Sequence, residues 1–280
     1  MSDQTMAGRT VLVTGASDGI GAETARVLAA RGATVHVTGR SAEKLRPVAE
    51  AVGTEPLVAD FSRLDDVRRL AASVGERVEK LDVLMNNAGG TFSPSRTTAD
   101  GHEPNFQVNH LAPFLLTNLL RPQLAAAGSS LVVNTSSIGN LMGKIVLDDL
   151  DYEHRRAIEF PAYGTGKLMN IVFTRGITQR WSGDGVVSVA VHPGPVGSSF
   201  GRDSWLVGLL YRSPLKRFAT ISVPDGAAPL IALAEGGPVQ EVNGRYYSRF
   251  HADGRENKQA HDQVVIDGLW ERSAALVGVS

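Results

Sequence analysis

Short apolar runs alternate along this chain with longer segments of helical periodicity, and this alternation limits the possible folds more than any other feature. The runs predicted as strands are Thr10–Thr14, Thr34–Thr38, Pro56–Ala59, Leu81–Met85, Leu131–Thr135, Val186–Val191 and a seventh near Arg245–Ser248. The segments predicted as helices are Ile20–Arg31, Ser41–Val52 with Ser41 as its N-cap, Asp65–Val78, Glu103–Ala127 with a kink at Pro113, and Tyr163–Trp181. Strands and helices that alternate at this spacing require right-handed crossovers, so the strands form a parallel sheet with helices on both faces.

Length and composition narrow the class of protein. The chain has 280 residues and no linker-like stretch, so one domain, residues 1–280, is expected. Its net charge of −1 gives no reason to expect a nucleic-acid or anionic-membrane surface. The absence of cysteine excludes disulfides, thiolate catalysis and cysteine-bound metal. The polar N-terminus and the lack of about 18 consecutive apolar residues predict a cytoplasmic protein without a membrane anchor.

Three glycines separate the first predicted strand from the first helix. Gly15 permits a tight turn, Gly19 lets the backbone approach a pyrophosphate, and Gly21 lets the helix pack closely on the strand. The N-terminus of the helix then offers free N–H groups to phosphates. A merely flexible loop would not explain why strand and helix flank the glycines so closely. The loop, which also holds Ser17, Asp18 and Ile20, predicts a dinucleotide site in a single Rossmann-type, doubly wound α/β sheet of about seven strands.

The end of the second predicted strand bears on which dinucleotide binds. An acidic residue there would favour NAD, but this chain has Gly39 followed by Arg40. A guanidinium can pair bidentately with a 2′-phosphate, so the sequence favours NADP(H). Arg40 could instead be a surface arginine at a helix start. Asp18, beside the phosphate loop, is a mild argument against a phosphorylated cofactor.

Tyr163 and Lys167 are four residues apart and so share one helix face. A lysine held near a phenol favours the phenolate, which makes the tyrosine a usable proton donor or acceptor near neutral pH. On its own this spacing is most often an ordinary solvated pair. Together with the glycine loop, it indicates a dinucleotide-dependent oxidoreductase.

Further motifs occur in a fixed order and carry a family resemblance. They are Asp60 with Phe61, the run Asn86-Asn87-Ala88-Gly89, Asn109 in Phe106–His110, Ser137 in Asn134–Ser137, and the loop with Pro193, Gly194, Val196 and Ser198. With the glycine spacing and the Tyr163–Lys167 pair, they make the chain resemble the main branch of the short-chain dehydrogenase/reductases over nearly its whole length.

This resemblance implies roles for the residues. Asp60 would hydrogen-bond the adenine ring, Asn87, Ala88 and Gly89 would line the cofactor site, and the Pro193–Ser198 loop would cover the nicotinamide. In the catalytic group, Tyr163 would transfer the proton, Ser137 would orient the substrate oxygen, Lys167 would bind the nicotinamide ribose, and Asn109 would hold a water that links Lys167 to solvent. The expected reaction interconverts a carbonyl and an alcohol on a small molecule with NADP(H), and no metal site is expected.

Within the family, Val108–Leu111 and the long interval 138–162 resemble the retinol-dehydrogenase and WW-oxidoreductase-like group. No membrane-anchoring segment is expected, so retinoid chemistry at a membrane does not carry over. The interval is unusually charged, with Asp148, Asp149, Asp151, Glu153, Arg155 and Arg156. A solvated surface excursion is its more ordinary interpretation, and substrate recognition is the alternative.

Two further hypotheses concern substrate and assembly. The apolar segment 199–218 is interpreted as a lid over a lipophilic substrate, with oligomer contact or core as the alternative. Relatives commonly pair the helix that bears the tyrosine and lysine, so a homodimer or homotetramer through Leu168, Ile171 and Val172 is predicted, unless these residues only pack on their own sheet. The rival functions are a non-catalytic NADP-sensing regulator and a structural subunit, and neither would need Ser137, Tyr163 and Lys167.

Overall fold

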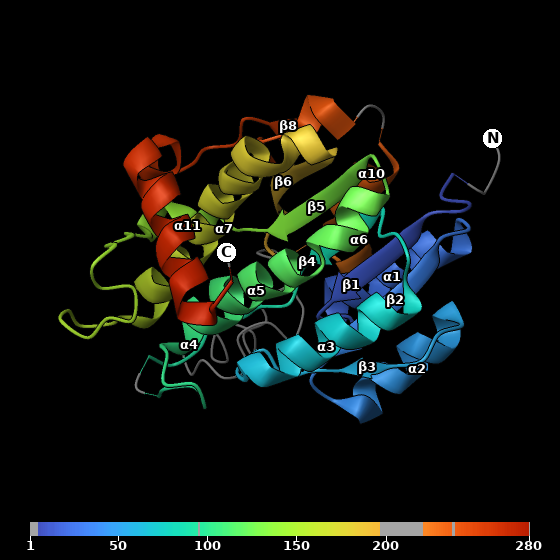
Figure 1. Ribbon diagram of the computed structural model, residues 1–280, viewed down its shortest axis with the longest axis horizontal. Helices are drawn as coiled ribbons and strands as arrows, with labels where there is room; N and C mark the ends of the chain where they lie inside the picture. Colours follow the sequence, from blue (N-terminus) through green and yellow to red (C-terminus); the bar gives the residue numbers. More distant parts are fainter. Residues whose placement is uncertain (1–4, 95, 197–220, 237–238, 280) are drawn as a thin grey trace.

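A single eight-stranded sheet forms the centre of the computed structural model, which describes residues 5–94, 96–196, 221–236 and 239–279 (Figure 1). The strand order is β3-β2-β1-β4-β5-β6-β7-β8, and all neighbours are parallel except the antiparallel pair β7–β8. The strands are β1 (Thr10–Thr14), β2 (Thr34–Gly39), β3 (Leu57–Val58), β4 (Val83–Asn86), β5 (Ser130–Thr135), β6 (Val186–His192), β7 (Tyr246–Ser248) and β8 (His251–Ala252).

Helices cover both faces of this sheet. The α-helices are α1 (Gly19–Ala30), α2 (Ala42–Val52), α3 (Leu64–Arg77), α4 (Pro104–Phe106), α5 (Ala112–Leu119), α6 (Arg121–Ala126), α7 (Glu159–Trp181), α10 (Val223–Glu235) and α11 (Gln263–Val277). Shorter helical turns are η1 (Gln107–Leu111), η2 (Ile138–Met142), η3 (Ser182–Asp184), η4 (Val239–Val242) and η5 (Lys258–His261).

The alternation of side chains along β1 divides the core into two layers. Val11 and Val13 point to one face, where they pack with α1, α2 and α10. Leu12 points to the other face, where it joins a larger cluster with α3, α5, α7 and α11. This is the period-2 geometry of a strand buried on both sides. The doubly wound parallel sheet predicted from the sequence is confirmed, and β8 is an added antiparallel edge strand.

The predicted continuous helix Glu103–Ala127 is wrong in its details. The chain forms α4, then the wider π-helical turn η1, then α5 and α6, with a break at Leu120. Pro113 has no N–H, so it cannot make the bond to the carbonyl of Asn109 that a regular α-helix would have. In η1 the N–H of Ala112 bonds to the carbonyl of Gln107, five residues back, which is the spacing of a π-helix. In place of the predicted kink there is a π-turn that ends at Leu111, two residues before the proline.

Helix α7 is buried along most of its length, which removes the predicted oligomer contact. Leu168, Ile171 and Val172 are at most 1% exposed within the single chain. They pack in the larger core cluster, and α11 lies against α7 on the side away from the sheet (Figure 1). These three residues are therefore unavailable to a second copy. Within the part of the chain described, no helix combines the length and the apolar character that crossing a bilayer requires.

Candidate active site

The glycine loop between β1 and α1 is packed so closely that side chains would not fit. Gly15 and Gly19 have φ values of 65° and 58°. A Cβ at Gly15 would lie 2.8 Å from the Cα of Ala88, and one at Gly21 would lie 2.4 Å from the carbonyl oxygen of Gly15. Such contacts exclude any larger residue. The loop is therefore drawn against the segment that follows β4, at the carboxyl edge of the sheet.

Asn87 and Thr14 fasten these two segments together. The Asn87 amide donates to the carbonyl of Thr14 at 2.9 Å, and the Thr14 hydroxyl accepts the backbone N–H groups of Asn87 and Ala88 at 3.0 and 2.9 Å. The sequence singled out Asn87 and Ala88 but not Thr14, whose residue type alone gives no signal. The N–H of Ala88 is thus already used within the protein.

The end of β2 lies beside the same loop. A Cβ at Gly39 would lie 2.0 Å from the Ser17 hydroxyl oxygen, so a larger residue would displace that hydroxyl. The Ser17 oxygen is buried and has no hydrogen-bond partner among the described residues. A buried hydroxyl without a partner costs free energy unless something bonds it. This orphaned oxygen and the exposed Arg40 next to Gly39 therefore fit a polar group bound at the end of β2.

Asp18 has a structural role that the sequence interpretation missed. It is the N-cap of α1, and its carboxylate accepts the N–H of Gly19 at 2.7 Å. A carboxylate at an N-cap stabilises the first turn of a helix. Its position is accounted for by the helix, which weakens the argument that it would repel a phosphorylated cofactor.

Asp60 and Phe61 follow β3 at the same edge. One carboxylate oxygen of Asp60, Oδ1, accepts both the N–H and the hydroxyl of Ser62. The Phe61 ring is 6% exposed and packs in the larger core cluster, while its carbonyl accepts the Gln107 amide at 3.2 Å. The side chain of Phe61 is therefore directed into the core.

Gly89 marks the point where Asn109 and Lys167 meet. A Cβ on Gly89 would lie 2.5 Å from Asn109 Oδ1 and 3.0 Å from Lys167 Nζ. Both side chains are buried, and they come from η1 and α7. Two polar groups that are 58 residues apart in the sequence thus converge after β4.

Gly139 marks a second meeting point, for Ser137 and Tyr163. A Cβ there would lie 3.2 Å from Tyr163 Cε1 and 3.5 Å from the Ser137 hydroxyl oxygen. Ser137 is the N-cap of η2 and accepts the N–H of Gly139 at 3.1 Å. The Lys167 ammonium lies 5.8 Å from the centre of the Tyr163 ring. The structure therefore brings together all four residues predicted to be catalytic.

The two glycines between Tyr163 and Lys167 explain how α7 approaches both of its neighbours. A Cβ on Gly164 would lie 2.4 Å from the carbonyl oxygen of Gly139 in η2. A Cβ on Gly166 would lie 2.8 Å from the carbonyl oxygen of Asn105 in α4. Each glycine thus removes the side chain that would hold a neighbouring segment away from α7.

Replacing Gly164 by alanine is expected to destabilise the fold. The new Cβ would meet backbone atoms, which cannot turn aside, so η2 would have to shift. Overpacking of this kind costs about 1–3 kcal/mol of unfolding free energy, measurable by denaturant titration. Gly183→Ala is the matched control, because nothing lies within 4 Å of its Cβ position. Equal stability of Gly164→Ala and the parent would contradict this account of the packing.

Lys167 is buried, and this burial makes its ammonium more acidic than that of an exposed lysine. Its ammonium donates to the carbonyl of Thr135 at 3.0 Å, at the end of β5. Burial lowers the pKa of Lys167 to about 8. A lysine near its pKa at physiological pH can both polarise a neighbouring phenol and pass on a proton.

The side-chain amide and oxygen of Asn109 both form hydrogen bonds to backbone groups. Its amide donates to the carbonyls of Gly90 and Asn105 at 2.9 and 3.1 Å, and its oxygen accepts the N–H of Gly90 at 3.0 Å. Pro113 cannot supply the N–H that the carbonyl of Asn109 would receive in a regular α-helix. Because the side chain is engaged in this way, a water held at Asn109 would have to bond its backbone carbonyl.

The loop after β6 completes this edge of the sheet. Gly194 has a φ of 102°, and a Cβ there would lie 2.7 Å from Ile221 Cδ1. Val196 is 6% exposed and forms a bridge with Ile221. Pro193 precedes this turn at the end of β6. Ser198 and the predicted lid 199–218 lie outside the described residues.

Asn140 and Asn257 were not predicted from the sequence, yet they secure the segment that begins at Ser137. Asn140 donates to the carbonyl of Ser137 at 2.8 Å and accepts the N–H of Asn257 at 2.8 Å. Asn257 also donates to the carbonyl of Gly143 at 2.8 Å. Because Asn257 is 117 residues beyond Asn140, no local pattern could have indicated the contact.

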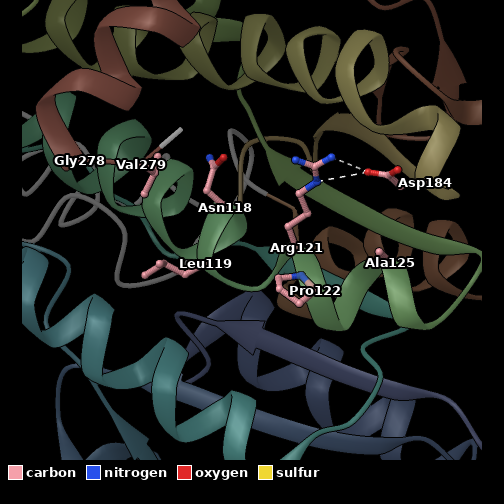
Figure 2. Close-up of a pocket in the computed structure, with 8 residues that line it drawn as sticks. All are labelled: Asn118, Leu119, Arg121, Pro122, Ala125, Asp184, Gly278 and Val279. Atoms are coloured by element: carbon pink, nitrogen blue, oxygen red, sulfur yellow. Dashed lines mark hydrogen bonds and ion pairs between the residues drawn. The ribbon is translucent and has the colours of Figure 1, made fainter.

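A hollow of about 820 Å³ lies at the opposite, amino-terminal edge of β5 and β6 (Figure 2). In it Arg121 pairs with Asp184 at 2.6 Å. The lining residues are Asn118, Leu119, Arg121, Pro122, Ala125, Asp184, Gly278 and Val279. None of them is a predicted site residue, so the hollow is separate from the candidate active site.

Comparison with known proteins agrees with this geometry. Residues 9–205 match the family model described as short chain dehydrogenase. The chain belongs to the short-chain dehydrogenase family. It is therefore a member of a family of oxidoreductases that use nicotinamide cofactors, and the predicted resemblance is confirmed.

Several relatives of this short-chain dehydrogenase are similar over nearly its whole length. Human retinol dehydrogenase 13 is 36% identical, with 99% of this chain and 87% of the relative covered. A protein named as the daunorubicin C-13 ketoreductase DnrU of Streptomyces sp. (strain C5) is 39% identical, with coverage of 97% and 93%. These matches confirm the resemblance to the retinol-dehydrogenase group.

Solved structures of related proteins share the fold. A crystal structure of an uncharacterized protein from Mycobacterium Paratuberculosis has a TM-score of 0.80 at 32% identity, covering 98% of this short-chain dehydrogenase and 95% of that chain. A protein described as a short chain dehydrogenase from Escherichia coli CFT073, complexed with NADPH, has a TM-score of 0.69 at 25% identity, with coverage of 90% and 100%.

Proposed function

We propose that this chain is an NADP(H)-dependent oxidoreductase that interconverts a carbonyl and an alcohol on a lipophilic small molecule, with Tyr163 as the acid–base group. The convergence of Ser137 and Tyr163 around Gly139, and of Asn109 and Lys167 around Gly89, carries this proposal. A protein that only senses or stores a dinucleotide has no need of this convergence. The names of the relatives refer to an alcohol, retinol, and to a ketone of daunorubicin, which supports the same class of reaction.

The residues around the glycine loop fit a phosphorylated dinucleotide. The N–H groups at the α1 N-terminus and the loop of Gly15, Gly19 and Gly21, with the backbone of Asp18 and Ile20, would hold the pyrophosphate. Arg40 and the orphaned Ser17 hydroxyl would hold the 2′-phosphate, and the second oxygen of Asp60 would accept from the adenine. The nicotinamide end would lie among Gly89, Lys167 and the Pro193–Ser198 loop. When bound, this cofactor supplies or takes up the hydride.

The acid–base chemistry follows from the four polar residues. In reduction, Ser137 donates a hydrogen bond to the substrate oxygen and Tyr163 gives it a proton. Lys167, with its pKa lowered to about 8, stabilises the phenolate that remains. Lys167 then passes a proton toward the Tyr163 phenolate, and a water on the carbonyl of Asn109 would return a proton to Lys167 from solvent.

The apolar side chains beside Ser137 favour a lipophilic substrate. Ile138 and Met142 lie in η2, immediately after Ser137, and are 48% and 54% exposed. Large apolar side chains left exposed beside a polar catalytic group are typical of a pocket for an apolar ligand. The lid hypothesis for residues 199–218 remains a prediction, as do the cytoplasmic location and a homo-oligomer, which would have to use a surface other than Leu168, Ile171 and Val172.

A turnover screen tests this proposal. The purified protein is mixed with NADPH and a panel of apolar ketones, aldehydes and quinones, and NADPH absorbance is followed. We expect consumption with at least one carbonyl and little with NADH. Tight NADPH binding without consumption across the panel would favour the non-catalytic regulator instead.

A further inference from the structure

The charged interval between Ser137 and Tyr163 is not the solvated excursion that its composition suggested. Asp149 is 8% exposed, pairs with Arg155 at 3.3 Å and accepts the N–H of His154. Arg155 donates to the carbonyls of Lys144 and Asp149. Glu153 and Arg156 are exposed, as that interpretation expected. Asp149 and Arg155, however, are held by the ion pair and hydrogen bonds just described.

Asp151 joins this interval to the segment that carries Asn109. Its Oδ1 accepts the N–H of Glu103 at 3.0 Å, and its Oδ2 lies 2.9 Å from His102 Nδ1. Both side chains of the Asp151–His102 pair are largely buried, at 20% and 14% exposure. Asp151 therefore holds the two residues that immediately precede α4, His102 and the N-cap Glu103.

A chain of hydrogen bonds runs from Glu103 to the catalytic group. Glu103 caps α4 by accepting the N–H of Phe106 and the amide of Asn105, each at 2.7 Å. The carbonyl of Asn105 accepts the amide of Asn109, and Asn109 binds Gly90, the neighbour of the glycine that faces Lys167. A displacement of Glu103 would therefore be transmitted to Asn109 through bonds that are all buried or partly buried.

Tyr152, the next residue, joins the interval to α7. Its hydroxyl donates to the Thr165 hydroxyl at 2.8 Å, midway between Tyr163 and Lys167 in the sequence. Tyr152 has a φ of 59°, a conformation that costs a non-glycine residue about 1–2 kcal/mol. The Arg155 guanidinium, 3.8 Å above its ring, helps to hold it there. A strained residue fixed by contacts on two sides is typical of a position that has a functional reason.

We propose that Asp151 and Tyr152 form a brace that fixes the Asn109 segment relative to α7, and that Asp151 is a positioning residue for turnover. This rests on the proposed function, because its catalytic consequence is the placement of Asn109 beside Lys167. Asp151 binds the residues that precede α4, and Tyr152 binds Thr165 in α7. The separation of α4 and α7 determines how Asn109 lies relative to Lys167. A cofactor-binding role is not implied, since neither residue lies at the glycine loop or at the end of β2.

Three variants of the full chain test the brace. Asp151→Ala removes both contacts, whereas Asp151→Asn keeps an acceptor for Glu103 N–H and a donor for neutral His102. Asp148→Ala is the control, since Asp148 lies in the same interval but its side chain is 87% exposed and pairs at the surface with Arg272. Hydrogen exchange of residues 103–111, kcat, KM and the NADPH dissociation constant are measured at pH 8, above the usual pKa of histidine. In the parent the hydrogen bond to Asp151 raises the pKa of His102, and both Asp151 variants remove that carboxylate.

We expect Asp151→Ala to exchange at least tenfold faster across residues 103–111 and to lose kcat by roughly tenfold, as misplaced catalytic groups do, with KM and NADPH affinity within about twofold. Asp151→Asn should bring both the exchange rate of residues 103–111 and kcat most of the way back to the parental values. Asp148→Ala should match the parent in both. Unchanged exchange in Asp151→Ala would overturn the brace whether or not the parent turns over. Faster exchange with an undiminished kcat would overturn the positioning role. A parent without turnover, with faster exchange in Asp151→Ala, would remove the proposed function and the positioning role but leave the mechanical link.

Discussion

Replacing Tyr163 by phenylalanine is expected to abolish turnover while leaving NADPH binding nearly intact. The ring of Tyr163 is 8% exposed and packs against Gly139, and phenylalanine keeps this packing. Only the hydroxyl is lost, and with it the proton that the substrate oxygen must receive. Loss of a positioned acid costs on the order of 10²–10⁴ in rate. The measurement is kcat on the best carbonyl of the panel, together with NADPH titration.

Tyr247→Phe provides the matched control for this variant. Tyr247 lies in β7, is partly buried and packs with the core cluster of Val11 and Val13, on the face of the sheet opposite to α7. Tyr247→Phe thus removes the same hydroxyl on the other side of the sheet. Its kcat should equal that of the parent. A Tyr163→Phe protein that keeps parental turnover would show that another group supplies the proton.

Arg40→Ala is expected to remove most of the preference for NADPH over NADH. Charge-assisted hydrogen bonds to a phosphate contribute roughly 1.5–3 kcal/mol, which corresponds to about 10- to 150-fold in the dissociation constant. Only the phosphorylated cofactor should be affected, because NADH has no 2′-phosphate to lose. Isothermal titration with both cofactors measures the change.

Arg46→Ala separates this effect from general loss of positive charge. Arg46 is an exposed arginine in α2, the helix that begins two residues after Arg40. We expect it to leave both dissociation constants unaltered. Equal binding of NADPH and NADH by the parent, or equal losses in the two variants, would show that Gly39 and Arg40 do not choose the cofactor.

The fold could be predicted from the sequence because its signals are local. A buried strand such as Thr10–Thr14 is a short apolar run, and the N-cap Ser41 accepts the N–H of Lys44 as its residue type suggests. Right-handed crossovers then require a parallel sheet with helices on both faces. The four catalytic candidates were also found, because each lies in a motif at the carboxyl end of a strand or on the helix that follows.

Several features depend on contacts between distant segments and could not be predicted. The π-turn η1 lies between Pro113 and the point where Gly166 of α7 approaches Asn105, whereas a proline alone suggests only a kink. The packing of α11 on α7, where Trp270 meets Phe173, could not be foreseen because the sequence interpretation did not place α11. The charged interval was misjudged because residue type does not tell whether Asp151 meets water or the N–H of Glu103.

The most direct test of the central claim is the transfer of a labelled hydride. The protein is supplied with NADPH carrying deuterium at both C4 positions of the nicotinamide and with apolar ketones and aldehydes, and the alcohols formed are examined by mass spectrometry. The proposed function predicts deuterium on the carbinol carbon in the product of the parent, and only background label with Tyr163→Phe. Product without deuterium, or equal labelling by the two proteins, would contradict it.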